Sequence, residues 1–230
     1  MTISVIIPTF NEETTLARTL AQTSAMPMEE VIVVDGGSTD RTVPMAHAFL
    51  TRVPHLRLVM SLQGRARQMN EGVKASRGDI LLFLHADTQL PSNARAVIER
   101  ALSGMRAIGG RFDVQFESES PWAPIVSSLM NWRSRWSGIA TGDQAIFIRR
   151  EMFDRLGGFA DIPLMEDIDF SRRMKQAGQT VALHETVTTS FRRWERQGPL
   201  RTIVSMWTLR LLYWLGVEPH RLHRWYREVR

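Results

Sequence analysis

Short apolar runs alternate with amphipathic segments over the first 100 residues of the chain. These runs are continuous, which is typical of strands covered on both faces of a parallel sheet. Asn11 is expected to cap the first helix, with Glu12 and Glu13 in its first turn. The pattern therefore predicts an α/β fold with a mostly parallel open sheet flanked by helices. Its expected strands are residues 3–7, 31–34, 56–60 and 80–84, and its later expected helices are residues 40–50 and 64–76.

The pattern loosens after residue 104. Residues 111–116 alternate polar and apolar positions, which predicts an antiparallel or edge strand. A glycine at position 178 is a suitable end for the helix before it. The other expected helices are 122–136, 167–176, 200–215 and about 220–227, and the other expected strands are 145–148, 180–183 and 187–189.

Composition excludes several classes of protein. The 230 residues are 43% hydrophobic, which excludes a disordered chain, and they include no Cys, which excludes disulfide frameworks, thiolate nucleophiles and Cys-based zinc sites. The first eight residues lack the basic segment of a signal peptide. The longest apolar stretch, 203–217, is interrupted by Arg210 and is too short to span a bilayer. We therefore expect a protein of the cytoplasm, either free or peripheral at the inner face of the membrane.

Positive charge gathers at the carboxyl-terminal end. The net charge of the chain is +5, and residues 192–230 hold nine Arg and three Glu. Lys74 and Lys175 are the two lysines among 29 basic residues. Such a bias suits either recognition of phosphate groups, which guanidinium groups bind through two hydrogen bonds, or simply a GC-rich genome.

Polar clusters follow several of the predicted strands. Residues 8–12 follow the first strand, residues 35–40 the second and residues 85–88 the fourth. Ligands of open parallel sheets bind at the carboxyl ends of the strands, so these clusters are expected to share one site. Each cluster could also serve only as a helix cap. The Gly-x-Gly-x-x-Gly fingerprint does not follow the first strand, which argues against Rossmann-type dinucleotide binding, and the Gly-x-x-x-x-Gly-Lys-Ser/Thr phosphate loop is also missing.

Five segments, in this order, resemble family 2 glycosyltransferases of GT-A fold. They are Ile-Ile-Pro-Thr-Phe-Asn-Glu-Glu (6–13), Val-Val-Asp-Gly-Gly-Ser-Thr-Asp (33–40), Gly-Arg-Ala-Arg-Gln-Met-Asn-Glu-Gly (64–72), Phe-Leu-His-Ala-Asp-Thr (83–88) and Met-Glu-Asp-Ile-Asp-Phe (165–170). The resemblance implies an enzyme that transfers a sugar from a nucleotide-diphosphate donor, UDP- or GDP-linked, to an unidentified hydroxyl acceptor with inversion at the anomeric carbon.

By this resemblance, several residues are expected to bind the donor, with Asp35 facing the base. These are Pro8, Thr9, Glu12, Asp35, Arg65 and Asn70. His85-Ala86-Asp87 stands at the family's Asp-x-Asp position, so Asp87 is expected to hold Mn²⁺ or Mg²⁺ on the donor diphosphate. His85 replaces the first Asp. It is either a nitrogen ligand, which would favour Mn²⁺, or a residue that supports the ligand or contacts the sugar.

The resemblance also assigns the general base. Asp167 would take the proton of the acceptor hydroxyl, with Glu166 beside it in the catalytic pair. Repulsion among these neighbouring carboxylates is expected to raise the pKa of one of them. Asp143 and Gln144 are expected to bind the donor sugar or the acceptor, although Asp143 could equally cap a turn.

Arg192-Arg193-Trp194 resembles a shortened form of the Gln-x-x-Arg-Trp motif of processive members. Arg193 would bind diphosphate and Trp194 would stack on a sugar. The missing Gln argues against a cellulose- or hyaluronan-type synthase. Together with His-Ala-Asp-Thr and Gly-Asp-Gln, this motif is closest to a small bacterial subgroup named for arsenosugar biosynthesis.

The chain is expected to divide into a catalytic domain, residues 1–198, and a basic helical appendage, residues 199–230. One face of the 200–215 helix is apolar and contains Trp207 and Trp214. This face suits a membrane interface, packing on the catalytic domain or a homodimer contact. Nucleic acid is not expected, because the basic tail lacks a recognised binding motif. Two other functions remain open: a nucleotidyltransferase on the same fold, which needs no base at Asp167, and a non-catalytic protein of the membrane surface.

Overall fold

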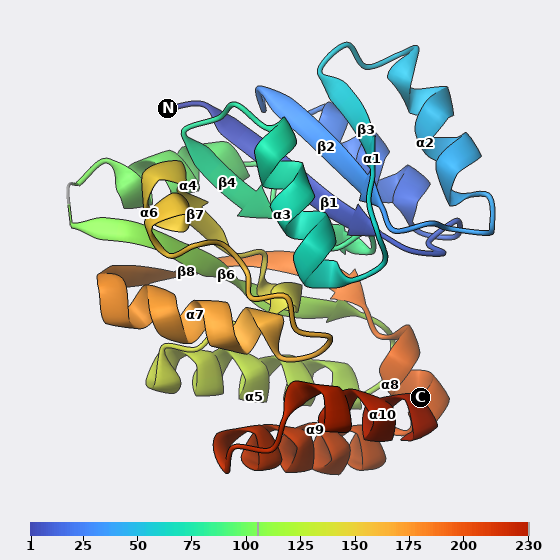
Figure 1. Ribbon diagram of the computed structural model, residues 1–230, viewed down its shortest axis with the longest axis vertical. Helices are drawn as coiled ribbons and strands as arrows, with labels where there is room; N and C mark the ends of the chain where they lie inside the picture. The colour runs from blue at the N-terminus through green and yellow to red at the C-terminus, as the bar shows by residue number, and fades with distance from the viewer. Residues whose placement is uncertain (105, 230) are drawn as a thin grey trace.

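The computed structural model describes residues 1–104 and 106–229, and side chains within 1–104 and 106–226. A single mixed sheet crosses this part of the chain in the order β3-β2-β1-β4-β7-β6-β8-β5 (Figure 1). Its strands are β1 (Ile3–Thr9), β2 (Glu30–Asp35), β3 (Leu56–Met60), β4 (Ile80–Phe83), β5 (Thr88–Gln89), β6 (Ala107–Glu117), β7 (Phe147–Arg149) and β8 (Gln179–Ser190). The neighbours β3, β2, β1 and β4 are all parallel, so the predicted α/β fold with a mostly parallel sheet is confirmed.

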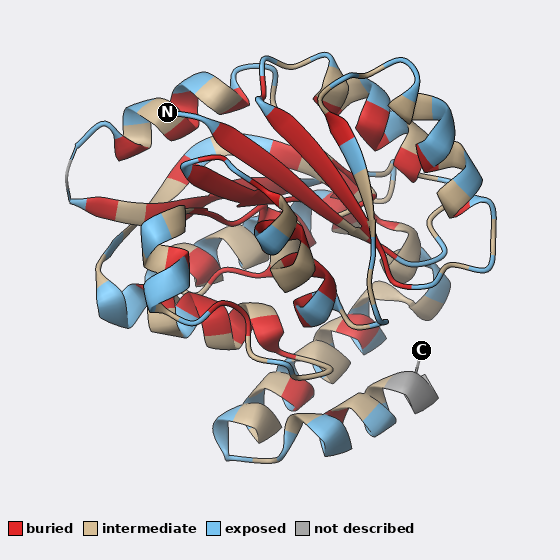
Figure 2. Ribbon diagram, turned by 45° about the horizontal axis from the view of Figure 1, so that its top comes forward, coloured by how far each residue is buried: buried red, intermediate tan, exposed pale blue. Residues whose placement is uncertain are grey.

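Helices cover both faces of the sheet (Figures 1 and 2). They are α1 (Leu16–Ser24), α2 (Thr42–Leu50), α3 (Arg65–Ala75), α4 (Ala94–Leu102), α5 (Trp122–Ser137), α6 (Arg150–Arg155), α7 (Glu166–Ala177), α8 (Arg192–Gln197), α9 (Pro199–Trp214) and α10 (Pro219–Val229), with a short 3-10 turn, η1 (Gly142–Gln144). The sequence pattern did not identify α4, α6, α8, β5 or η1, most of which are too short to show a period.

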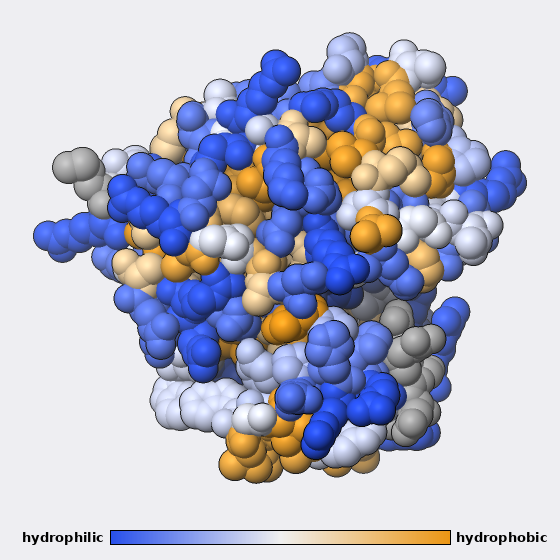
Figure 3. All heavy atoms as spheres, viewed as in Figure 1, coloured by the Kyte–Doolittle hydropathy of each residue, from blue (hydrophilic) through white to orange (hydrophobic). Residues whose placement is uncertain are grey.

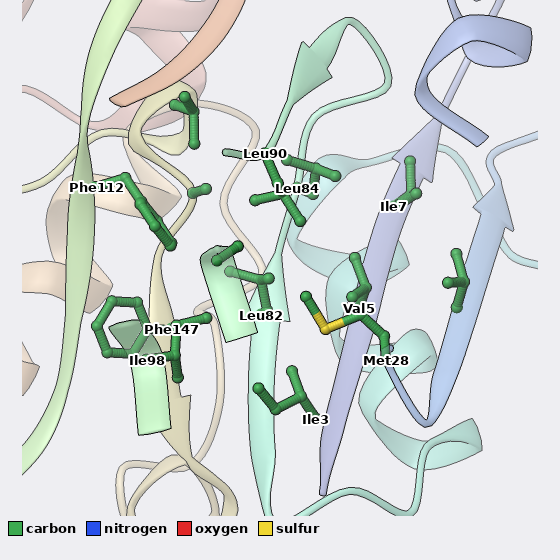
Figure 4. Close-up of a cluster of buried hydrophobic side chains, with 14 of the residues drawn as sticks. Ile3, Val5, Ile7, Met28, Leu82, Leu84, Leu90, Ile98, Phe112 and Phe147 are labelled. Carbon is green, nitrogen blue, oxygen red and sulfur yellow. The ribbon is translucent and has the colours of Figure 1, made fainter. Parts of the chain in front are cut away.

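Alternate residues of β1 enter two separate cores. Val5 packs in a cluster with α1, α2 and α4, and Figure 4 shows it near Ile7, Leu82 and other side chains on that face. Ile6 packs on the opposite face with α3 and α7. A strand buried on both faces has no polar side, which explains its continuous apolar sequence.

The second half of the sheet differs in part from the prediction. Of the two alternatives for the strand of residues 111–116, the antiparallel strand is confirmed and the edge strand is wrong: β6 lies between β7, to which it is antiparallel, and β8, to which it is parallel. The two expected strands 180–183 and 187–189 are one strand, β8, which pairs with β6 along its length through a register shift. Two polar positions of β6, Arg111 and Asp113, are buried nonetheless, because they pair with each other and Arg135 bonds Asp113 at 2.7 Å, whereas Gln115 and Glu117 are exposed.

The start of α1 was also predicted wrongly. The helix begins at Leu16 and has no acidic residue in its first turn. Asn11 does not cap it. Asn11 has a positive φ of 54°, and its side chain accepts a hydrogen bond from the backbone N–H of Thr39 at 2.9 Å. Asn tolerates this left-handed conformation, and here it ties the loop after β1 to the loop after β2.

The carboxyl-terminal helices leave the apolar face of α9 exposed, which fits two of its expected roles, a membrane interface or a homodimer contact, and excludes packing of this face on the catalytic domain. The buried positions of α9 are Thr202 and Leu209, and Leu209 packs with Met165, Ile168 of α7 and Leu222 of α10. The apolar face of α9 points outward instead. Its exposed residues are Leu200, Val204, Trp207, Leu211 and Trp214. Division of the chain at residue 198 stays a prediction. Among the described residues, none of the helices has the length and apolar character needed to cross a bilayer.

Close packing of β6 leads to a testable prediction. A methyl group on Gly110 would lie 2.2 Å from the backbone oxygen of Val181, so Gly110→Ala should lower the free energy of unfolding by about 1–3 kcal/mol in urea denaturation. Gly104→Ala is the matched control, because no described atom lies within 4 Å of the added carbon. Equal stability of the two variants would contradict the close pairing of β6 with β8 at this position.

Candidate active site

A cavity of about 440 Å³ opens at the carboxyl ends of β1 and β4. The β1–α1 loop and the turn after β4 form one side, while α5, α8 and α9 form the other. Such crevices are the usual ligand sites of open α/β sheets. The residues expected from the sequence that line it are Pro8, Glu12, Arg65, His85, Asp87, Asp143, Arg193 and Trp194.

Asp87 faces this cavity beside a positive charge that the sequence analysis did not assign. Its Oδ2 atom lies 3.6 Å from Nη2 of Arg192, and the same nitrogen lies 3.3 Å from Oε2 of Glu12. The hydroxyl of Thr189 donates to Oδ1 of Asp87 at 3.4 Å. The Asp87 side chain keeps 26% of its surface exposed, so its carboxylate is oriented yet open to a ligand.

His85 pairs with Asp143 across the cavity floor. Nδ1 of His85 lies 3.0 Å from Oδ1 of Asp143, while Nε2 is buried and has no hydrogen-bond partner among the described residues. Burial alone would raise the pKa of Asp143, but its hydrogen bond with His85, together with the charges of His85, Arg65 and Arg193, lowers it to about 2. Asp143 is therefore held as a carboxylate.

Gly142 connects His85 to Asp167. A methyl group at Gly142 would lie 2.4 Å from Nε2 of His85, so a glycine allows the close approach of the imidazole. The Gly142 N–H donates to Oδ2 of Asp167 at 2.8 Å, and the Ile168 N–H donates to Oδ1 at 2.7 Å. Asp167 lines a small recess together with Pro8, which also borders the main cavity. Its carboxylate is thus fixed by two backbone donors at the start of α7.

Glu166 is the buried member of this acidic pair. Only 4% of Glu166 is exposed, and its Oε1 atom lies 3.5 Å from Nη1 of Arg65. Burial raises the pKa of Glu166 against the attraction of Arg65, and the charge of Asp167 raises it further. The expected raised pKa is therefore on Glu166, with burial as a larger cause than like-charge repulsion.

Other predicted residues lie outside the cavity wall. Asp35 is fully buried and accepts hydrogen bonds from the backbone of Gly37 and Ser38, so it shapes the loop after β2 and does not face open space. The Thr9 hydroxyl lies 3.4 Å from Oδ1 of Asp35. These hydrogen bonds occupy oxygen lone pairs of Asp35 that could otherwise accept a hydrogen bond from the nucleotide base.

Asn70 and Gln144 also bond to the protein itself. Asn70 donates to the backbone oxygen of Phe159 at 2.8 Å and accepts from its N–H at 3.0 Å. Gln144 is fully buried and accepts from the Thr141 N–H at 3.2 Å. Both side chains position segments next to the cavity.

The two residues of the Arg-Trp motif lie on α8 and contact different parts of the protein. The guanidinium of Arg193 lies 4.7 Å from the centre of the Tyr226 ring. Trp194 stacks on Phe191 and packs against Phe116. Part of its ring surface is therefore in contact with a hydrophobic cluster of the protein.

Two further arginines enter the cavity from helices that no motif marked. Arg133 comes from α5 and Arg210 from α9. Burial lowers the pKa of Arg133 to about 9, and the charge of Arg210 contributes. In the sequence, the one feature that could have indicated a role for Arg210 is that it interrupts an apolar stretch. Arg133 gives no signal, because the residue that it meets in space is distant in the chain.

The donor atoms present suit a metal that arrives with a ligand. Among the described residues, no group of three His, Cys, Asp or Glu side chains converges on one point. Mg²⁺ is commonly bound by one or two carboxylates together with substrate phosphates and water. Asp87 fits this pattern because it is a partly exposed carboxylate on the cavity. His85 fits less well as a ligand, because its two ring nitrogens face Asp143 and Gly142.

Comparison with known sequences agrees with this geometry. Residues 4–160 match the family described as Glycosyl transferase family 2. An undecaprenyl-phosphate 4-deoxy-4-formamido-L-arabinose transferase of Pseudomonas aeruginosa is 32% identical over 158 residues, which are 64% of this chain and 46% of that protein. A PGL/p-HBAD biosynthesis glycosyltransferase of Mycobacterium bovis is 30% identical over 186 residues, or 74% of this chain and 68% of that protein. The chain thus spans about half the length of the first of these relatives.

Solved structures share the fold at low sequence identity. The mannosyltransferase PcManGT from Pyrobaculum calidifontis, in complex with GDP-Man and Mn²⁺, has a TM-score of 0.64 at 22% identity, covering 81% of this chain and 56% of that one. TarS of S. aureus, in complex with UDP-GlcNAc, has a TM-score of 0.62 at 19% identity, covering 83% of this chain and 58% of that one. The expected GT-A-like fold is confirmed. Because the family match extends over more than half of its length, the chain belongs to glycosyl transferase family 2.

Proposed function

We propose that this protein is a metal-dependent, inverting glycosyltransferase that moves a sugar from a nucleotide-diphosphate donor to an acceptor hydroxyl. The observation that carries the proposal is a pair of differently held carboxylates, Asp87 on the cavity and Asp167 in the recess that shares Pro8, Arg65 and His85 with it. Asp87 is partly exposed and faces a cation, whereas Asp167 is fixed by two backbone N–H groups. The first arrangement suits a metal ligand and the second suits a base.

The donor would bind along the ends of β1 and β4. Asp87 would hold Mn²⁺ or Mg²⁺, with Arg65 and Arg193 near the diphosphate and His85 positioned by Asp143 against the sugar. The metal supplies positive charge to the leaving diphosphate. Arg192 now neutralises Asp87 and Glu12, so it would turn toward the donor when a metal takes its place. GDP- and UDP-sugars in the solved neighbours support a donor of this class.

In the chemical step, the acceptor oxygen would bond to the anomeric carbon from the face opposite the diphosphate. The bond from that carbon to the diphosphate oxygen breaks, and its electron pair leaves with the nucleoside diphosphate. Asp167 would accept the proton of the attacking hydroxyl. Glu166, with its raised pKa and its contact with Arg65, would position this pair without taking the proton.

The remaining predicted residues would act by shaping the site. Thr9 and Asp35 hold the nucleotide loop, and Asn70 and Gln144 hold the segments before α7 and around η1. The resemblance to a subgroup named for arsenosugar biosynthesis stays a prediction about the acceptor. A nucleotidyltransferase is less favoured, because it gives no use to a fixed carboxylate at Asp167.

We also propose that the protein lies on the surface of a membrane. Two exposed apolar stripes support this: Ile125, Leu129, Trp132 and Trp136 on α5, and Leu200, Val204, Trp207, Leu211 and Trp214 on α9. Apolar side chains gather at the end of the molecule formed by α9 (Figure 3). Trp beside Arg is typical of surfaces that lie among anionic headgroups. Leu129 and Trp207 also line the cavity, so the cavity would open toward the lipid.

A nucleotide titration tests the donor site. Calorimetry with UDP, GDP, CDP, ADP and dTDP should find one nucleotide that binds at least about tenfold more tightly with Mn²⁺. Asp87→Ala should remove the effect of Mn²⁺, because the diphosphate and metal lose their protein ligand. Asp161→Ala, which removes a surface partner of Arg67, is the control and should bind as wild type. If Asp87→Ala keeps the full effect of Mn²⁺, the metal assignment is wrong.

Replacement of the base should separate binding from transfer. Asp167→Asn should lower donor-dependent release of nucleoside diphosphate by about 10²–10⁴-fold, because the amide cannot accept the proton. Binding of the nucleotide should stay unchanged. Asp169→Asn on the same helix, which loses a pair with Arg173, should keep its activity. Wild-type turnover by Asp167→Asn would exclude Asp167 as the base.

Vesicle binding tests the membrane surface. The protein should sediment with vesicles of phosphatidylcholine and phosphatidylglycerol, less so at high salt, and the double variant Trp207→Ser/Leu211→Ser should remain in solution. Leu62→Ser is the control, since Leu62 is 74% exposed on a loop outside these helices. Equal sedimentation of the double variant would contradict the proposal. A wild-type dimer that this variant dissociates would assign the stripes to a second copy of the chain.

A further inference from the structure

Arg133 and Arg210 have hydrogen-bond donors that no described residue accepts. Nε and Nη2 of Arg133 and Nε of Arg210 are buried, and they have no partner among the described residues. Nη1 of Arg133 donates a hydrogen bond to the backbone oxygen of Ile139 at 3.4 Å. Buried polar groups are almost always satisfied in folded proteins, so unused guanidinium donors in a cavity indicate a missing anion.

The two guanidinium groups also repel each other without a matching carboxylate in contact. The positive charge of Arg210 lowers the pKa of Arg133, after the effect of burial, and burial lowers the pKa of Arg210. Asp167 and Asp143 attract both arginines from a distance, with no hydrogen bond or ion pair to either one among the described residues. A divalent anion between the arginines would remove this repulsion.

Arg133 and Arg210 come from other elements than the residues assigned to the donor. Arg65 and Arg193 come from the segments that carry the donor-binding motifs, whereas Arg133 and Arg210 come from α5 and α9. Arg210 lies beyond the residues that match the family. Arg133 and Arg210 are both within electrostatic reach of Asp167, the proposed base, as an acceptor site requires.

The wall next to these arginines is apolar. Leu129 and Met130 of α5 and Ile203 and Trp207 of α9 line the same cavity. Leu129 and Trp207 are exposed as well, so this wall continues onto the outer stripes of the two helices. A ligand that satisfies both features has an anionic head and an apolar chain.

We propose that Arg133 and Arg210 bind the phosphate group of an acceptor that is the phosphate monoester of an apolar chain, held at a membrane surface. This inference rests on the proposed transferase function and names its acceptor class. Guanidinium groups bind phosphate through paired hydrogen bonds, which suits a dianionic head better than a neutral alcohol.

The reaction then has a defined atom balance. A phosphate oxygen of the acceptor bonds to the anomeric carbon, and the bond from that carbon to the donor's β-phosphate oxygen breaks. Its electron pair leaves with the nucleoside diphosphate. The second pKa of a phosphate monoester is about 6, so at pH 7 most of the acceptor is a dianion that attacks without losing a proton, and Asp167 takes the proton of the monoanionic fraction. The loss of activity in Asp167→Asn should therefore be smaller with this acceptor than with an alcohol. The product is a sugar joined to the chain through a phosphodiester.

Binding of decyl phosphate tests the subsite. It is titrated below its micelle-forming concentration into protein saturated with Mn²⁺ and the nucleoside diphosphate that binds. Arg133→Gln and Arg210→Gln should each weaken its binding at least about tenfold, because each removes a charged pair of donors. Arg133→Lys and Arg210→Lys, which keep the charge, should fall between. Arg201→Gln, an exposed position on α9, is the control and should match wild type.

Two further probes separate the head from the chain. Glycerol phosphate has the same head without the apolar chain and should bind at least about tenfold more weakly than decyl phosphate, and so should decanol, which lacks the phosphate. Equal binding of glycerol phosphate would assign the subsite to a soluble phosphate ester and overturn the lipid part. Melting temperatures of the variants verify that they are folded.

The outcomes also distinguish this inference from the function on which it rests. If the nucleotide binds with Mn²⁺ but neither arginine substitution changes the binding of decyl phosphate, the acceptor inference is wrong and the proposed transferase function is unaffected. If the substitutions weaken the nucleotide instead, the arginines belong to the donor site and the inference is wrong. If no nucleotide binds, the donor proposal fails, while titration of decyl phosphate alone still reports on the arginines.

Discussion

The contact of His85, Gly142 and Asp167 is the constraint on which the site depends. A single glycine allows the imidazole after β4 to approach the η1 turn, and its N–H orients the carboxylate at the start of α7. Three segments distant in sequence thereby take fixed positions around one cavity. Any larger residue at position 142 would displace His85 and weaken the hold on Asp167 at once, because both contacts involve the same residue.

The cavity beside this contact is lined by more positively charged than negatively charged side chains. His85, Arg65 and Arg193 keep Asp143 ionised, and burial acts against this charge. Arg133 and Arg210 meet no such partner among the described residues. A protein that buries charge without pairing it loses stability, so the unpaired guanidinium groups are explained by a bound anion and not by the folded chain alone. Several of the many arginines of the chain line this cavity, where they suit binding of an anion.

Helices α5 and α9 do two tasks with adjoining parts of their surfaces. Each brings one arginine, Arg133 or Arg210, into the cavity, and each exposes apolar residues beside it, of which Leu129 and Trp207 also line the cavity. A soluble helix normally buries its apolar stripe, so two neighbouring helices with the reverse orientation indicate a shared apolar partner. A bilayer surface meets this need for both helices and would bring the acceptor to the mouth of the cavity.

The order of residues alone was enough to predict the α/β alternation, the positions of most longer helices and the acidic and histidine residues at the strand ends. Continuous apolar strands have to be covered on both faces, and polar groups after them have to meet at one sheet edge. Packing between distant segments decided which polar groups face the cavity. Asp35 accepts hydrogen bonds from backbone N–H groups of its own loop, and Asn11 joins two loops in place of capping a helix. The same packing turned the apolar face of α9 outward and brought Arg133 near Arg210. Periodicity shows which residues share a face of one helix, but the partner of that face depends on elements distant in the chain.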